Sequence, residues 1–255
     1  MRLKTLGCSG GIGAGARTSA MLVNNDILID AGTGVGDLEP SQLANIRHVF
    51  LTHSHLDHIA SLPLLLDSVF DSLGSDCVRV YARDETIEAL QTHIFNWVIW
   101  PDFASLPSAE NPVLRFEPFN PGQTIRLDEF EISAVEVEHT VPSQGFVMSS
   151  GKSTLAISGD TSTNQTLWPY LNELPQLETL IVEVSFADEQ ADLAKKSGHY
   201  TPATMVSDLK KLKHKPALWL NAMKPGEEQQ ILGQVRAALP GREVNMLARG
   251  VSFEL

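Results

Sequence analysis

Short apolar and β-branched runs, separated by turn residues, recur along the chain and predict β-strands. Some of these runs alternate apolar and polar side chains, whereas others are apolar throughout, as in strands that are buried on both faces. The predicted strands are Met21–Val23, Ile27–Ile29, Val49–Leu51, Val78–Tyr81, Ile132–Val137, Gly145–Met148, Thr154–Ile157, Thr179–Val182 and Ala217–Leu220.

Helical periodicity of the apolar positions appears between these strands. One predicted helix follows His58, and the others span Thr86–Trp97, Pro202–Leu212 and Glu227–Ala238. Because strands and helices interleave, the pattern favours a layered α/β architecture over an all-β sandwich. Five prolines interrupt residues 100–122, so this segment is predicted to be a long loop or lid that follows a helix.

Composition adds constraints on size and partners. The 255 residues are 43% hydrophobic and 20% charged, which supports a packed core and argues against intrinsic disorder. No internal repeat or linker-like stretch is present, so one domain spanning residues 1–255 is expected. The net charge of −12 argues against nucleic acid as a partner, because phosphate binding depends on clustered Lys and Arg.

Cysteine content and hydropathy indicate a cytoplasmic location. Cys8 and Cys77 cannot build a disulfide framework, and neither lies in a Cys-x-x-Cys pair, so a reducing compartment is the simpler interpretation. The first residues lack the apolar core of a signal peptide. No apolar run approaches the roughly 20 residues needed to cross a bilayer, and no membrane association is expected.

The clearest chemical signal is the sequence Thr-His-Ser-His-Leu-Asp-His at residues 52–58, between a predicted strand and a predicted helix. His53 and His55 are separated by one residue, so in an extended segment they point the same way and can bind one ion. Asp57 and His58, at the start of the helix, can reach a second ion. The pattern therefore predicts a metal site.

Two later residues are candidates for the remaining ligand positions. His139 follows the predicted strand Ile132–Val137, and Asp160 follows Thr154–Ile157 and a Ser-Gly turn. A carboxylate at a strand end can bridge two ions. Together with residues 52–58, these residues provide six imidazole and carboxylate ligands, a set that suits two divalent ions.

The motif His-x-His-x-Asp-His, with a later His and a later Gly-Asp, resembles the metallo-β-lactamase fold superfamily over nearly the whole chain. This resemblance implies an αββα sandwich with the metals at one edge between the sheets. It also implies that Asp30, after the strand Ile27–Ile29, is a buried aspartate that supports the metal loop. The implied ligands are His53, His55 and His139 on one ion, Asp57 and His58 on the other, and Asp160 bridging both.

Three further stretches narrow the resemblance within the superfamily. Residues 6–11, 52–62 and 198–202 are similar to class II 3′,5′-cyclic nucleotide phosphodiesterases and, less closely, to the long tRNA 3′-processing endonucleases. The run Glu183–Phe186 fits both groups. The glycines of residues 7–13 permit either close backbone approach to a phosphate or a simple turn.

The activity implied is hydrolysis of cAMP or cGMP to a nucleoside 5′-monophosphate by two divalent ions, with zinc first and manganese or iron as alternatives. Asp57 would ligate one ion and orient the attacking water. His199, before a Thr-Pro that can start a helix, would assist departure of the 3′ oxygen. The family suggests a homodimer. The enzymatic alternative is a phosphodiesterase with an RNA substrate, which the net charge disfavours.

Ala222 departs from the family pattern. The final metal ligand of the family is a histidine after the last core strand, followed in class II phosphodiesterases by Lys-Pro. Here Lys224 and Pro225 are present, but Ala222 stands in the place of the histidine. Three explanations follow: a weakly held second ion, a disabled variant of an active enzyme, or a protein that binds a nucleotide without cleaving it.

Overall fold

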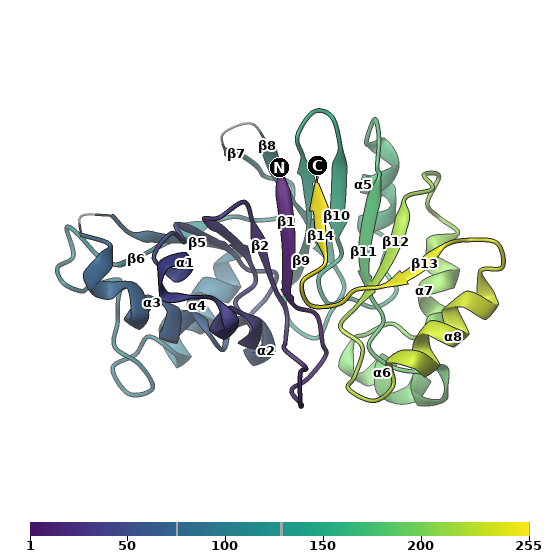
Figure 1. Ribbon diagram of the computed structural model, residues 1–255, viewed down its shortest axis with the longest axis horizontal. Coiled ribbons are helices and arrows are strands. Elements are labelled where there is room, and N and C mark those ends of the chain that lie inside the picture. The colour runs from purple at the N-terminus through teal and green to yellow at the C-terminus, as the bar shows by residue number, and fades with distance from the viewer. Residues whose placement is uncertain (75, 128–129, 255) are drawn as a thin grey trace.

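Two mixed seven-stranded sheets lie face to face, and helices cover their outer faces (Figure 1). The computed structural model describes residues 1–74, 76–127 and 130–254. This arrangement confirms the predicted αββα sandwich.

The first sheet comes mainly from the N-terminal half of the chain. Its strand order is β14-β1-β2-β3-β4-β5-β6; the first four strands pair antiparallel, and β3 to β6 pair in parallel. The strands are β1 Arg2–Gly7, β2 Ala20–Val23, β3 Ile27–Ile29, β4 His48–Phe50, β5 Val78–Ala82, β6 Leu114–Pro118 and β14 Ser252–Glu254.

The second sheet repeats this organisation with the C-terminal half. Its order is β13-β12-β11-β10-β9-β8-β7, with β10 to β13 parallel and β7 to β10 antiparallel. The strands are β7 Thr124–Leu127, β8 Phe130–Val137, β9 Ser143–Ser149, β10 Thr154–Ile157, β11 Thr179–Glu183, β12 Ala217–Asn221 and β13 Val244–Met246.

The helices divide between the two outer faces (Figure 1). On the first sheet they are α1 Pro40–Leu43, α2 Leu56–Ile59, α3 Leu62–Val69 and α4 Asp84–His93, with short 3-10 helices at Thr33–Asp37 and Phe70–Ser72. On the second sheet they are α5 Leu167–Glu173, α6 Ala191–Ser197, α7 Pro202–Leu209 and α8 Glu228–Ala238, with a 3-10 helix at Asp188–Gln190.

Three apolar layers hold the sandwich together. One layer lies under the helices of each sheet, and the third fills the space between the sheets. In this central layer Phe50 of β4 packs edge-on against Phe119 and Phe146, with ring centroids 5.6 and 6.0 Å apart. Burial of these large rings is a major source of attraction between the two sheets.

Two sequence predictions about this fold are wrong. Residues 100–122 are not wholly a loop, because β6 lies within them; its Pro118 is tolerated at the end of a strand on the edge of the sheet. The helix predicted to reach Trp97 ends at His93. Beyond it, the Asn96 side-chain oxygen accepts hydrogen bonds from the amides of Val98 and Ile99 and holds a turn.

None of the helices in the described part of the chain combines the length and the apolar character that spanning a bilayer requires. Cys8 and Cys77 are both free.

Candidate metal centre

The loop that carries residues 52–58 follows β4 and is fixed by contacts with both sheets. The amide and hydroxyl of Thr52 donate to the Asp30 carboxylate at 2.8 and 3.0 Å. From β9 of the other sheet, the Gln144 amide donates to the Thr52 carbonyl at 3.0 Å, and its side-chain nitrogen donates to the Leu51 carbonyl at 3.2 Å. The loop therefore lies at the edge where the two sheets meet.

Asp30 is buried directly after β3 and orients His58. The Nδ1 of His58 donates to Asp30 at 2.6 Å, which leaves Nε2 facing Asp160 at 3.3 Å. A carboxylate bonded to one ring nitrogen fixes the tautomer and direction of the other, the usual arrangement behind a metal-binding histidine.

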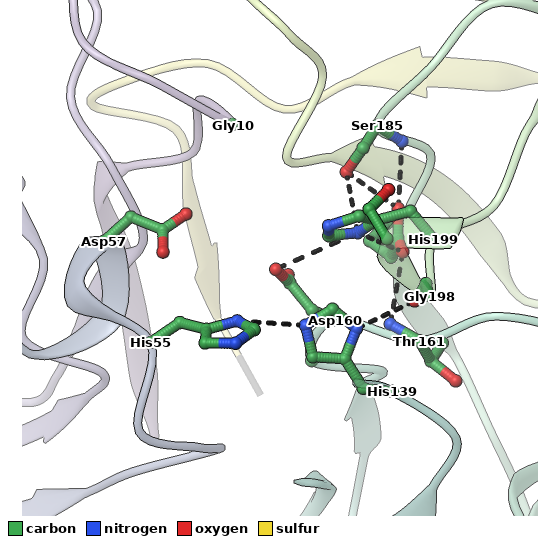
Figure 2. A network of polar contacts seen from close by, with 12 residues as sticks. Gly10, His55, Asp57, His139, Asp160, Thr161, Ser185, Gly198 and His199 are labelled. Atoms are coloured by element: carbon green, nitrogen blue, oxygen red, sulfur yellow. Dashed lines mark hydrogen bonds and ion pairs between the residues drawn. The ribbon is translucent and has the colours of Figure 1, made fainter. Parts of the chain in front are cut away.

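Three histidines form a first group of possible ligands. One ring nitrogen from each of His53, His55 and His139 lies within 4.8 Å of those of the other two. The Nδ1 of His139 donates to the Gly198 carbonyl at 2.8 Å, so its Nε2 faces Nδ1 of His55 at 3.1 Å (Figure 2). The Nε2 of His53 is buried without a hydrogen-bond partner. Nitrogen atoms arranged in this way can share one cation.

Asp160 belongs to two further groups of possible ligands. It lies with His53 and His58 in one group, and with His139 and His199 in the other. Asp57 is outside these groups, with Oδ2 3.9 Å from Nε2 of His58. In Figure 2, Asp57 and His55 approach from one side of the site and the other labelled candidates from the opposite side.

Burial favours the neutral form of the three histidines of the first group, which is the form that binds metal. It lowers the pKa of His53 well below its ordinary value, and it also lowers the pKa values of His55 and His139. A histidine binds a cation through an unprotonated nitrogen, so these three rings are suited to ligation near neutral pH.

His58 and Asp160 behave as an ion pair. Burial disfavours the charged imidazole, but the carboxylates of Asp160 and Asp30 outweigh burial and raise the pKa of His58 well above its ordinary value. Burial also disfavours the Asp160 carboxylate, but His58 outweighs it and holds the pKa of Asp160 well below its ordinary value. Ligation through Nε2 of His58 therefore requires the loss of a proton.

His199 lies between α6 and α7 and is oriented by a buried carboxylate. Its Nδ1 lies 2.9 Å from Glu183, 3.2 Å from the Ser185 hydroxyl and 4.0 Å from Asp160 (Figure 2). Burial lowers the pKa of His199, but the hydrogen bond and the charge of Glu183 outweigh burial, and the net shift is upward. His199 is therefore suited to carry a proton.

The glycine-rich loop near the N-terminus packs against residue 222. The Gly10 amide donates to the Met223 carbonyl, and the Lys224 ammonium donates to the Gly10 carbonyl at 2.7 Å. A Cβ on Gly10 would lie 2.3 Å from the Ala222 carbonyl oxygen. The loop needs glycine here for close backbone packing, and its Gly10 amide is already bonded within the protein.

The structure thus brings together five of the six predicted ligands and His199, with Asp57 at the rim. His48, His93 and His214 lie outside the three groups. Sequence reasoning missed three supporting contacts: those from Gln144, from the Gly198 carbonyl, and from Glu183 to His199. Nothing in the sequence marks Gln144. Gly198 has φ +69°, and a Cβ there would lie 3.0 Å from Nδ1 of His139.

Two facing mixed sheets with a histidine and carboxylate cluster at one edge define a metallo-β-lactamase fold, a class that binds divalent metal. The model of the β-lactamase superfamily domain matches residues 25–220, and the chain belongs to that superfamily.

Similar proteins include two kinds of phosphodiesterase. A probable 3′,5′-cyclic-nucleotide phosphodiesterase of Yersinia pestis is 32% identical over 183 residues, covering 66% of this chain and 51% of that protein. A ribonuclease Z of Clostridium beijerinckii is 32% identical over 151 residues, covering 55% of this chain and 46% of that protein. The chain thus spans about half the length of these relatives.

Among solved structures, unliganded yeast PDE1 superimposes with a TM-score of 0.82 at 18% identity, covering 100% of this chain and 99% of that one. At this identity the likeness establishes the fold alone.

Proposed function

We propose that this chain is a metal-dependent phosphodiesterase that hydrolyses 3′,5′-cyclic nucleotides to nucleoside 5′-monophosphates. The proposal rests on the position of His199, whose Nδ1 lies 2.9 Å from the Glu183 carboxylate and 4.0 Å from the Asp160 carboxylate. A histidine oriented by a buried carboxylate beside a metal-ligand cluster is arranged to protonate a leaving alkoxide. Phosphodiester hydrolysis requires that step.

The donor set fits divalent ions, because imidazole and carboxylate groups converge and the buried Nε2 of His53 has no protein partner. In this proposal His53, His55 and His139 would hold one ion, Asp57 and His58 would hold a second, and Asp160 would contribute to both. Zinc is the first candidate, with manganese and iron compatible. When bound, such ions lower the pKa of coordinated water and neutralise developing charge on phosphate.

Two residues of the chain have proposed roles in the reaction itself. Asp57, whose side chain is 38% exposed at the rim, orients the attacking water. His199 donates a proton to the departing 3′ oxygen, and its raised pKa favours the protonated ring near neutral pH.

Ala222 bears on the strength of the second ion site. It directly follows β12, the neighbour of β11, which ends at Glu183. Alanine contributes no ligand where the family pattern has histidine, so the second ion has fewer protein ligands and weaker binding. A disabled form of the enzyme, or a protein that binds nucleotide without turnover, remains the alternative consistent with this residue.

The choice of a cyclic nucleotide is supported by the similarity to the Yersinia phosphodiesterase, whereas the similarity to ribonuclease Z supports an RNA substrate. A net charge of −12 disfavours a polyanion such as RNA, whose binding requires clustered cations. A small-molecule substrate, a homodimer and a cytoplasmic location belong to the same proposal.

The decisive experiment incubates the metal-loaded protein separately with 3′,5′-cAMP, 3′,5′-cGMP, a precursor tRNA and bis(p-nitrophenyl) phosphate. Chromatography of the products should reveal 5′-AMP or 5′-GMP. Cleavage of the precursor tRNA without cyclic nucleotide turnover would instead support the RNA function. Tight cAMP binding without turnover would support the binding protein.

Asp57→Ala should lower kcat at least about a hundredfold, the scale of a lost group that assists proton transfer. The exposed Asp67 of α3 provides the matched control, and Asp67→Ala should retain wild-type turnover. Retention of most activity in Asp57→Ala would remove Asp57 from the proposed mechanism.

A further inference from the structure

A pocket of about 400 Å³ borders His199 on the second half of the molecule. Residues 162–163, helix α6 and the start of α7 form its walls, and Lys195, His199 and Thr204 are among the lining residues. Its volume lies within the range of roughly 300–1,000 Å³ that small-molecule sites occupy. A second hollow of about 310 Å³, between residues 14–17 and Met223, includes none of the candidate site residues.

The two ring nitrogens of His199 have different partners. Nδ1 is engaged by Glu183 and Ser185. Nε2 has no hydrogen-bond partner among the described residues, and it is not fully buried. Nε2 is therefore the nitrogen that can give a proton to a ligand.

The chemistry of the leaving group determines what must lie beside that nitrogen. When water opens a 3′,5′-cyclic phosphate to a 5′-monophosphate, the P–O3′ bond breaks and O3′ takes a proton. O3′ remains attached to the ribose, so the nucleoside stays next to the proton donor. Cleavage of an RNA strand that leaves a 3′ hydroxyl also releases O3′, which is likewise attached to the ribose of a nucleoside.

The pocket offers suitable contacts for a nucleoside. Ala191 gives it apolar surface and Thr163 provides a hydroxyl group, whereas the Thr204 hydroxyl is engaged by Thr201 at the start of α7. The Lys195 ammonium has no protein partner among the described residues and can donate hydrogen bonds to a base or sugar. A mostly apolar wall with a few polar groups is typical of sites that orient small ligands.

We infer that the pocket between α6, α7 and residues 162–163 binds the nucleoside that carries the leaving 3′ oxygen. This inference rests on the proposed phosphodiesterase function and on the role of His199 in it. Lys195 is then a residue that determines substrate affinity, since it contacts the nucleoside and not the reacting phosphate.

Paired variants on one helix test the inference. Lys195→Ala should raise the KM for 3′,5′-cAMP about tenfold, equivalent to about 1.4 kcal/mol, with little change in kcat. Lys196→Ala, which removes the neighbouring exposed lysine outside the pocket, should leave both constants unchanged. Hydrolysis of bis(p-nitrophenyl) phosphate, which carries no nucleoside, should be equal in both variants and the wild type.

A second pair of variants compares a tryptophan placed in the pocket wall with one placed outside the pocket. Ala191→Trp puts a large ring at the pocket wall and should raise the KM for cAMP further, whereas Ala203→Trp, at an exposed site of α7 outside the pocket, should not. An unchanged KM for cAMP in both Lys195→Ala and Ala191→Trp would overturn the inference. If the wild type cleaves precursor tRNA but no cyclic nucleotide, and both variants weaken that cleavage, the pocket binds an RNA nucleoside and the proposed cyclic-nucleotide substrate is wrong.

A binding experiment separates a wrong proposed function from a wrong assignment of the pocket. If the metal-loaded wild type hydrolyses none of these substrates, calorimetric binding of 5′-AMP is compared in wild type and Ala191→Trp. Binding that is lost in Ala191→Trp supports the pocket as a nucleoside site in a protein without turnover. Binding that persists unchanged, or no binding to the wild type, overturns it.

Discussion

Asp30 and Ala222 both adopt a left-handed backbone conformation, with φ of +57° and +59°, directly after β3 and β12. Such conformations cost non-glycine residues roughly 1–3 kcal/mol and persist where the surrounding structure imposes them. Aspartate, asparagine and histidine tolerate this region better than alanine does. The backbone at position 222 thus suits the histidine of the family pattern at least as well as the alanine present.

Asp30→Asn tests the carboxylate behind His58. Asparagine fits the same backbone conformation but lacks the negative charge, so His58 loses its orienting anion. Metal affinity should fall about 10–100-fold, as for other groups that orient metal ligands. Competition with a chelator measures the change. Asp26→Asn, at a partly buried position outside the metal centre, is the control, and equal affinities in the two variants would contradict the role.

Ala222→His tests the proposed weakness of the second ion site. The added imidazole should convert a weak second ion into a tight one, because each added ligand raises affinity. After dialysis against a weak chelator, elemental analysis should find close to two ions per chain in the variant and close to one in the wild type. Unchanged stoichiometry would mean that residue 222 does not correspond to the final ligand of the family.

At the scale of elements, α7 positions the segment that bears His199. Asp208 of α7 is 2% exposed and accepts hydrogen bonds from the Tyr200 hydroxyl at 2.7 Å, the Trp168 indole at 3.1 Å and the Asn164 amide at 3.1 Å. The Lys211 ammonium forms an ion pair with the other carboxylate oxygen of Asp208 at 2.7 Å. One buried carboxylate therefore ties α5 and the loop after β10 to the residue that follows His199.

Tyr200→Phe removes the hydrogen bond to Asp208 and the two that the Tyr200 hydroxyl accepts from Asn164 and Trp168, so the buried Asp208 carboxylate loses one donor. The free energy of unfolding should fall by about 1–3 kcal/mol, the typical cost of such a loss. Urea unfolding measures it. Tyr170→Phe, on the half-buried tyrosine of α5, should change stability by less than about 0.5 kcal/mol. Equal effects of the two substitutions would contradict the importance of the Asp208 network.

At the scale of the whole molecule, the candidate ligands come from both halves of the sandwich. His53, His55 and His58 follow a strand of the first sheet, whereas His139 and Asp160 follow strands of the second. An ion held by both halves binds the folded chain and not the unfolded one. Metal binding should therefore stabilise the entire fold by mass action.

Excess zinc should raise the melting temperature and a chelator should lower it. At free zinc 1,000-fold above Kd the stabilisation is about 4 kcal/mol. In a protein of this size each kcal/mol shifts the midpoint by roughly 2–4 °C. His139→Ala should lose most of the zinc-dependent rise in a thermal scan. His93→Ala, at an exposed position of α4, should keep it, and an equal loss in both would argue against the assigned ligand.

Local patterns were enough to predict much of this protein. The motif at residues 52–58, the strand before it and the helix after it all depend on neighbours in sequence, so ligand spacing could be recognised directly. The interleaving of strands and helices indicated the layered fold. By contrast, β6 escaped prediction because Pro118 and nearby prolines obscure a strand whose pairing with β5 is a contact distant in sequence.

The sequence by itself determined about half of the elements, the ligand types and the family resemblance, because periodicity and short-range spacing are properties of the chain. Only the tertiary structure decided how the site is supported and where its edge lies: the Gln144 contacts that hold the metal loop, the Glu183 partner of His199, and the position of Asp57 at the rim. These contacts join residues from different strands and sheets, and their geometry depends on how the two sheets pack.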